Sequence, residues 1–245
     1  MKTIILSTLM LFLCTGLLAQ KKTEYQLTPA FPVTVDGDLS EWRNKLTPVD
    51  ADSSWSFAVS QDADFFYIAI QVKDKMLQQD AARHGFIVNI NTEGKKKEGA
   101  QLFYPIPDSE SIRALSRDDN LAHMNIREEL IKRSRGYGLK GFAHIVDGLL
   151  SFENTYDVKA FAKLNEQDQL LYEAMIPIKA IGFKRNQEKF ALQLAINNRF
   201  AQLQKAMRKA PPQRVGIYGM QPQTSLKNPY KVKTEVWMQG QLNKN

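Results

Sequence analysis

The sequence predicts an all-β protein, an antiparallel β-sandwich that carries a short helical insertion. Short segments in which apolar residues alternate with small or polar ones recur along most of the 245-residue chain. Turn signals rich in Gly, Asp and Asn separate these segments. Many short strands joined by such turns are typical of a sandwich or barrel. The expected strands are 31–35, 54–60, 65–72, 86–91, 100–106, 139–146, 149–154, 159–164, 170–176, 190–197, 214–219 and 233–239.

The clearest local signal is Val35-Asp36-Gly37-Asp38-Leu39-Ser40-Glu41-Trp42. Asp36-Gly37-Asp38 is a turn signal, because Gly adopts positive φ without cost and Asp side chains accept hydrogen bonds from nearby backbone N–H groups. Leu39 and Trp42 follow at a spacing that lets one helical turn press both onto an apolar surface. Trp42 is therefore expected in the core.

The next segment predicts a β-hairpin. Trp55, Phe57 and Val59 alternate with small residues, and Asp62-Ala63-Asp64 then leads into an apolar run that ends near Val72. Trp55 is expected to point inward. The third tryptophan, Trp237, lies in a closing strand where core and rim are both open.

One stretch departs from the strand pattern. Between about 118 and 134, Asp118-Asp119 is placed to cap a helix on which Leu121, Met124, Leu130 and Ile131 recur at roughly helical spacing. We expect a helical insertion on the sandwich. Its default role is to cover a sheet edge, and the alternative is a lid over a binding face.

The first nineteen residues predict a secretory signal peptide. A single charge, Lys2, precedes an apolar run from Ile4 to Leu18 that ends at Ala19-Gln20. Lipid attachment at Cys14 is the competing interpretation, but Leu13 occupies the position where a small residue is expected. Cleavage near Ala19 leaves residues 20–245 as one domain without cysteine and without a transmembrane span, which excludes disulfides and thiol chemistry. The expected location is the periplasm, the cell surface or the medium.

Charge and motifs exclude several functions. The formal net charge of +7 is spread along the chain, and no nucleic-acid-reading motif accompanies it. No nucleophile elbow, zinc-protease motif or phosphate-binding glycine loop occurs. The three histidines, at 84, 123 and 144, lack ligand spacing, and the adjacent pair Glu128-Glu129 diverges on a helix. Asp36 and Asp38 suit a calcium ligand set or a simple turn, and the turn is favoured. We expect no enzyme, metal or cofactor.

Later segments extend the pattern of the opening motif and the hairpin at 60–70. These are Leu171–Ile178 with Ile181-Gly182-Phe183, Phe190–Asn197, and Gln213–Gly216. Together they resemble the family 9 carbohydrate-binding modules and their DOMON-like relatives, from Pro32 to Leu242 apart from about 108–155. The resemblance implies a non-catalytic β-sandwich.

The resemblance also implies a sugar site. Sugar-binding members of the family hold a terminal sugar between two tryptophans, one before the strand that corresponds to Phe86–Asn91 and one before the last strand. Here Leu77–Arg83 and Thr224–Pro229 contain no Trp, so this clamp is missing. Arg214 matches a strand arginine that contacts ligand in such modules. The carbohydrate-binding residues expected on the same face are Arg214, Asn228, Tyr218 and Tyr104.

Three functions remain open. The first is an exported, non-catalytic carbohydrate-binding protein whose partner is a glycan or another component of the cell envelope. The second is an envelope scaffold or interaction protein without a small ligand. The third is a haem-binding DOMON-like module for electron transfer, with Met220 and His144 as candidate axial ligands.

Overall fold

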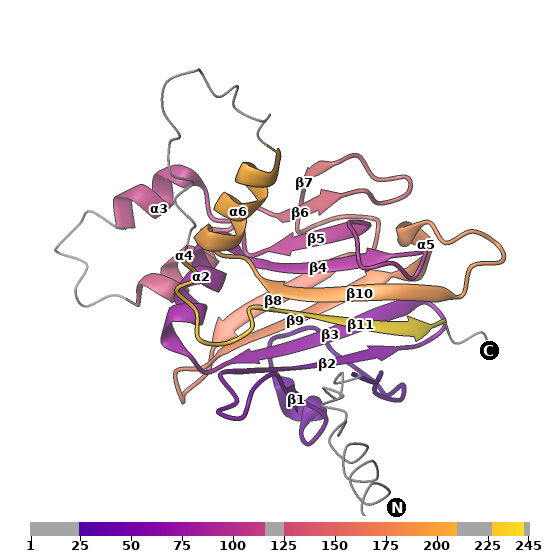
Figure 1. Ribbon diagram of the computed structural model, residues 1–245, viewed down its shortest axis with the longest axis horizontal. Helices are drawn as coiled ribbons and strands as arrows, with labels where there is room; N and C mark the ends of the chain where they lie inside the picture. The colour runs from indigo at the N-terminus through magenta and orange to yellow at the C-terminus, as the bar shows by residue number, and fades with distance from the viewer. Residues whose placement is uncertain (1–24, 116–124, 210–226, 243–245) are drawn as a thin grey trace, which may run out of the picture.

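The computed structural model describes residues 25–115, 125–209 and 227–242, and two antiparallel sheets face each other in it (Figure 1). The antiparallel β-sandwich predicted from the sequence is confirmed. The first sheet has the order β1 (Thr47–Pro48), β2 (Trp55–Gln61), β3 (Phe65–Val72), β9 (Leu170–Pro177), β8 (Lys159–Leu164). The second has the order β11 (Glu235–Gln241), β10 (Lys189–Ile196), β4 (Phe86–Asn91), β5 (Ala100–Tyr104), β6 (Tyr137–Lys140), β7 (Gly148–Leu150).

The main core lies between the two sheets. Alternate residues of β3 and β10 point into it, and Phe66 and Phe190 meet edge to face with ring centroids 4.9 Å apart. Trp55 is fully buried in this core, as its alternation predicts, and its indole Nε1 donates a hydrogen bond to the carbonyl of Lys233 at 2.8 Å. Period-two alternation therefore identifies the inward face of these strands correctly.

A second, smaller core covers the outer face of the first sheet. The 3₁₀ helix η1 (Leu39–Trp42) places Leu39 and Trp42 against Ala58, Ala69 and Leu171. Trp42 is 0% exposed. β2 is consequently buried on both of its faces, which the sequence pattern of a half-buried strand does not show.

The opening motif is held by a buried carboxylate. Glu173 of β9 is fully buried and accepts hydrogen bonds from the amides of Asp36 (3.1 Å) and Gly37 (2.7 Å) and from Trp42 Nε1 (2.8 Å). Burial raises the pKa of Glu173 to about 6, while these three donors act in the opposite direction. The turn and the indole therefore serve to satisfy a carboxylate that would otherwise be buried without partners.

Gly37 is required in this turn for two reasons. Its φ of +79° lies in the left-handed region, and a Cβ there would lie 2.6 Å from Cδ1 of Phe161. The ring of Phe161 lies on the outer face of β8, so the turn rests directly on the sheet. This close approach explains the glycine of the motif.

Three expected strands differ from the structure. Residues 31–35 form no strand, because Phe31 and Val33 pack onto the small outer core instead of pairing with a sheet. The strand expected at 139–146 ends at Lys140, since Gly141 (φ +71°) turns the chain and its amide donates to Asp147 Oδ1 at 2.6 Å. The strand expected at 149–154 ends at Leu150, and the strand expected at 214–219 lies outside the described residues.

The helices were largely missed from sequence. The sequence pattern does not predict α2 (Lys75–His84), α3 (Ser109–Leu115), α5 (Ile178–Ile181) or α6 (Arg199–Lys209), and Leu77–Arg83, the first segment that lacks the clamp tryptophan, lies inside α2. α4 (Ile126–Lys132) falls within the predicted insertion, but Asn125 occupies its N-cap position. The expected cap at Asp118-Asp119 lies outside the described residues. α4 packs against α2 and against β8, which is an edge strand.

Within the described residues, no helix has the length and apolar character needed to cross a membrane.

Candidate functional site: the cleft between α2 and α4

Helices gather at one end of the sandwich, where α2, α3, α4 and α6 lie together, whereas α5 lies at the other end (Figure 1). Between α2 and α4 the surface is hollowed by a cleft of about 350 Å³. Most of its lining residues are polar, and three of them carry a positive charge. The residues that line it are Lys75, Gln79, Arg83, Asn125, Ile126, Arg127 and Leu130.

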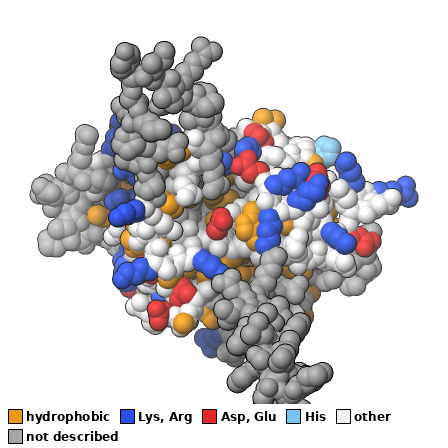
Figure 2. All heavy atoms as spheres, in the orientation of Figure 1, with side chains coloured by type: hydrophobic (Ala, Val, Ile, Leu, Met, Phe, Trp, Pro, Cys, Tyr) orange, Lys and Arg blue, Asp and Glu red, His pale blue; other side chains and the backbone are white. Residues whose placement is uncertain are grey.

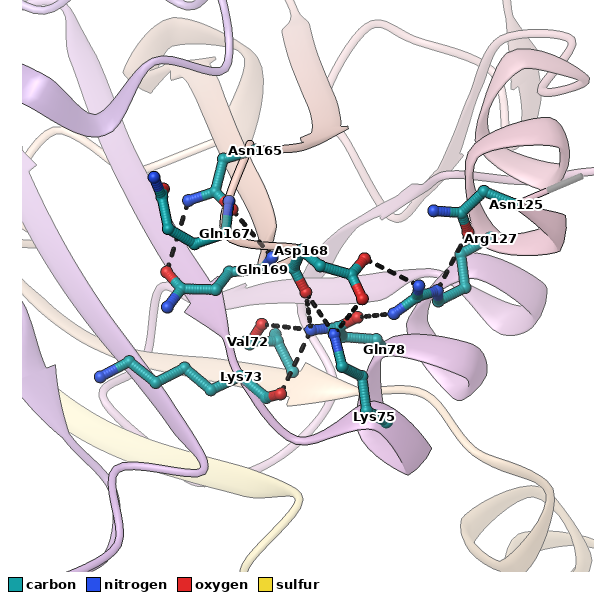
Figure 3. Close-up of polar contacts among 10 residues, drawn as sticks. All are labelled: Val72, Lys73, Lys75, Gln78, Asn125, Arg127, Asn165, Gln167, Asp168 and Gln169. Carbon is teal, nitrogen blue, oxygen red and sulfur yellow. Dashed lines mark hydrogen bonds and ion pairs between the residues drawn. The ribbon is translucent and has the colours of Figure 1, made fainter.

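Gln78 fixes α2 to the sandwich. This fully buried amide donates from Nε2 to the carbonyls of Val72 at 2.9 Å and Asp168 at 3.0 Å, so it joins the end of β3 to the turn between β8 and β9 (Figure 3). A buried amide with satisfied donors holds its orientation tightly. Its Oε1 is thereby presented to Arg127 on the opposite helix.

Arg127 is held by three partners. Its Nη1 donates to Gln78 Oε1, its Nη2 lies 2.8 Å from Asp168 Oδ1, and its Nε donates to Asn125 Oδ1 at 3.1 Å (Figure 3). The side chain is 16% exposed. A guanidinium fixed by several hydrogen bonds loses little further freedom when it binds a ligand. Arg127 is therefore a pre-organised donor at the cleft.

Asp168 is shared by two cations. Lys75 Nζ donates to its backbone carbonyl at 2.6 Å and to its carboxylate, which also pairs with Arg127. The hydrogen bond from Lys75, with Arg127 beside it, lowers the pKa of Asp168, so this carboxyl is ionised at neutral pH. The turn that carries Asp168 is closed by Asn165, whose Oδ1 accepts from the amide of Gln169 at 2.8 Å.

Arg83 has no such partner. It is half-buried in the last turn of α2, and among the residues that the structure describes it makes no hydrogen bond or ion pair. One turn earlier, Asp80 accepts a hydrogen bond from the hydroxyl of Tyr230 at 2.5 Å. Burial lowers the pKa of His84, so this neighbour is neutral at pH 7. The lining contains Lys75, Arg83 and Arg127 and no carboxylate, so the cleft carries an excess of positive charge.

Apolar side chains complete the cleft. Ile126, in the first turn of α4, is half-buried and offers a small non-polar surface beside the charged groups, whereas Leu130, one turn further on, is 1% exposed and packs in the main core. The lining contains no nucleophile paired with a base. Within 25–115, 125–209 and 227–242, no three His, Cys, Asp or Glu side chains are grouped so as to hold a metal ion. The arrangement is suited to binding a polar or anionic group next to an apolar surface.

Of the four expected carbohydrate-binding residues, the structure describes Tyr104 and Asn228. Tyr104 is 6% exposed and packs in the core on Tyr137, with ring centroids 5.5 Å apart, and burial raises its pKa to about 12. Asn228 is exposed, and its Oδ1 accepts from the amide of Tyr230 at 3.0 Å. Arg214 and Tyr218 lie outside the described residues.

The first of the two segments that would carry the tryptophan clamp contacts the residue that follows the second. The hydrogen bond between Tyr230 and Asp80 joins the stretch before β11 to α2. The nearest signal for α2 was present in the sequence: Asp74 caps the helix through Leu77, and Gly85 ends it. The cleft could be predicted only if Lys75–His84 was first predicted to be a helix.

Other candidate groups are placed as follows. Trp237 is half-buried on the edge strand β11. His144 is exposed with a φ of +65° in the turn after β6, and its proposed haem partner Met220 lies outside the described residues. Asp36 and Asp38 accept hydrogen bonds from the amides of Asp38 (2.7 Å) and Ser40 (3.0 Å), which is the turn that the sequence favours.

Comparison with known proteins adds a weak likeness of fold. No protein-family model matches the chain, and no curated protein matches it. A family 9 carbohydrate-binding module from Caldicellulosiruptor kristjanssonii, solved in complex with glucose, is similar in structure with a TM-score of 0.35 and 12% identity. The match covers 73% of this chain and 81% of that one.

Proposed function

We propose that the protein is an exported, non-catalytic carbohydrate-binding protein of the periplasm or cell surface, and that a glycan binds in the cleft between α2 and α4. The observation that carries this proposal is the fixed guanidinium of Arg127 beside the apolar surface of Ile126. A sugar needs donors and acceptors for its hydroxyl groups and an apolar surface for its C–H faces, and both lie together here.

The size of the cleft limits what it holds. Small-molecule sites range over roughly 300–1,000 Å³, and the volume of about 350 Å³ lies near the lower end. The ligand is therefore one or two sugar rings, such as the end of a longer glycan. Export rests on residues 1–19, whose sequence is typical of a signal peptide.

The test is a glycan-binding screen on the exported form of the full chain, followed by titration calorimetry on the best ligand. Arg127→Gln is expected to weaken binding at least about tenfold, because it removes donors that are already oriented. Arg43→Gln is the matched control, since Arg43 is an exposed arginine at the end of η1. Absence of saturable glycan binding, or equal binding by Arg127→Gln, would contradict the proposal.

A second candidate function is a scaffold or interaction protein of the envelope, and one feature favours it. On α6, Leu203 and Met207 lie one turn apart and are 40% and 54% exposed. Exposed apolar residues at helical spacing are typical of a helix that binds a partner. Crosslinking of the exported chain to one envelope protein, lost in Leu203→Gln with Met207→Gln and retained in Arg43→Gln, would support this function.

A further inference from the structure

We propose that the ligand of the α2–α4 cleft is an acidic saccharide, a uronate whose carboxylate is bound by Arg83. This inference rests on the proposed function and names its ligand class. It comes from the distribution of charge in the cleft, from the absence of partners for Arg83 among the described residues, and from the character of the lining.

The positive charge of the cleft is only partly balanced. Lys75 and Arg127 share the single carboxylate of Asp168, and Arg83 adds a further cation to the same lining. A carboxylate ligand that enters the cleft would supply the missing negative charge. Charge-assisted hydrogen bonds of this kind are stronger than those to neutral hydroxyl groups.

The nearest other carboxylates are already engaged. Asp80, one turn before Arg83 on α2 and outside the lining, attracts Arg83 electrostatically but accepts its hydrogen bond from the hydroxyl of Tyr230. On α4, Glu128 pairs with Lys132 at 2.8 Å. Neither carboxylate belongs to the lining, so no hydrogen bond from another described residue occupies the guanidinium of Arg83.

The lining lacks an aromatic side chain. Neutral sugars are usually oriented by stacking on an aromatic ring, and the described residues of this cleft offer only Ile126 as accessible apolar surface. Orientation must then come from polar groups. The planar, forked guanidinium of Arg83 matches a carboxylate in two parallel hydrogen bonds, which fixes a ring by its C6 group.

The two signs of charge are mixed on one face of the molecule. On the face drawn in Figure 2, lysine and arginine side chains are spread among acidic ones instead of forming one continuous positive field. General attraction of any polyanion would require such a field. Selectivity for an acidic saccharide is therefore expected to depend on the cleft residues.

The experiment compares paired ligands by titration calorimetry: oligogalacturonate, oligoglucuronate and oligomannuronate, each beside its methyl ester. Esterification removes the charge and keeps the sugar ring and linkage. At least one uronate is expected to bind about tenfold or more tighter than its ester, and to weaken as salt rises from about 50 mM to about 200 mM.

Arg83→Gln is expected to bring the uronate to within about twofold of its ester while binding of the ester stays unchanged. Arg43→Gln is expected to keep the full preference. Because Arg83 has no partner among the described residues, its replacement is expected to leave the thermal unfolding midpoint unchanged.

The outcomes separate the two proposals. Binding of neutral glycans or of the esters as tight as that of the uronates overturns the acidic-ligand inference and leaves the proposed function in place. Binding of a sulfated oligosaccharide without any uronate overturns the carboxylate assignment. An unchanged uronate preference in Arg83→Gln overturns the role of Arg83. No saturable binding of any glycan, acidic or neutral, overturns both proposals.

Discussion

Trp42 stabilises the fold through the charge of Glu173, and a double-mutant cycle measures this contribution. Trp42→Phe keeps an aromatic ring against Phe31, whose ring centroid lies 4.9 Å from that of Trp42, but removes the Nε1 donor to Glu173. A hydrogen bond to a charged group contributes about 1.5–3 kcal/mol, and one to a neutral group about 0.5–1.5 kcal/mol. The cost of Trp42→Phe should therefore depend on the charge at position 173.

The cycle combines Trp42→Phe with Glu173→Gln at pH 7, where the carboxyl is ionised because its pKa is about 6. Gln carries no charge and has one acceptor oxygen where Glu173 uses two, one for Trp42 Nε1 and one for the amides of Asp36 and Gly37, so the cost of Trp42→Phe is expected to be at least about 1 kcal/mol smaller in the Glu173→Gln background. The packing cost of the smaller ring is common to both backgrounds and cancels. Urea denaturation, followed by circular dichroism, measures the free energy of unfolding.

Trp55→Phe is the matched control for this cycle. Its indole donates to the carbonyl of Lys233 and lies in the main core, apart from Glu173. Its cost is expected to be the same with Glu or Gln at position 173, within about 0.5 kcal/mol. Equal costs of Trp42→Phe in the two backgrounds would refute the reasoning.

Three further predictions concern the same elements. Folding raises the pKa of Glu173 from 4.5 to about 6, so the folded state binds more protons than the unfolded state in this interval, and stability falls as pH rises through it. The free energy of unfolding of the wild type, relative to that of Glu173→Gln, should therefore drop by about 2 kcal/mol between pH 4 and pH 7 in urea titrations. Parallel pH dependences of the two proteins would contradict this. Gly37→Ala should destabilise by about 1–2 kcal/mol from the left-handed φ alone, with an added clash on the ring of Phe161 that Phe161→Ala relieves, as thermal denaturation of both variants would show. Asp168→Asn should change the free energy of unfolding by less than about 1 kcal/mol, since the side chain of Asp168 is 47% exposed. It should also tighten uronate binding several-fold in calorimetry, because it removes a carboxylate that competes with the ligand. Weaker binding would count against the charge argument.

The local sequence pattern was sufficient to predict a strand where every second residue faces the core. The strands at 65–72, 86–91 and 159–164 were predicted at their observed bounds, because one side of each strand faces the core and alternation records this. The short turn of helix at 39–42 was predicted from two apolar residues and a capping turn. The hydrogen-bond partner of that turn, Glu173, lies 131 residues from Trp42, so no residue near the motif could have predicted it.

The candidate site was not predictable in the same way. α2 has few apolar residues, and its burial rests on Leu77, Ala81 and Ala82 with the amide of Gln78, so its sequence resembled a polar loop. Of the four residues expected to bind sugar, Tyr104 lies in the core because the cluster of Tyr137 and Tyr172 surrounds it. The sequence around a single tyrosine in a strand does not distinguish a ligand-binding side chain from one that packs in the core.

The sequence by itself determined the class of fold and the inward face of most strands, because period-two alternation and turn chemistry act between neighbours in the chain. Only the tertiary structure decided that Gln78, Arg127 and Asp168 meet, since they lie 49 and 41 residues apart in sequence. Long-range hydrogen bonds between polar side chains produce no periodic pattern in the sequence from which they could be predicted. The cleft and its charge therefore exist only once the helices are packed on the sandwich.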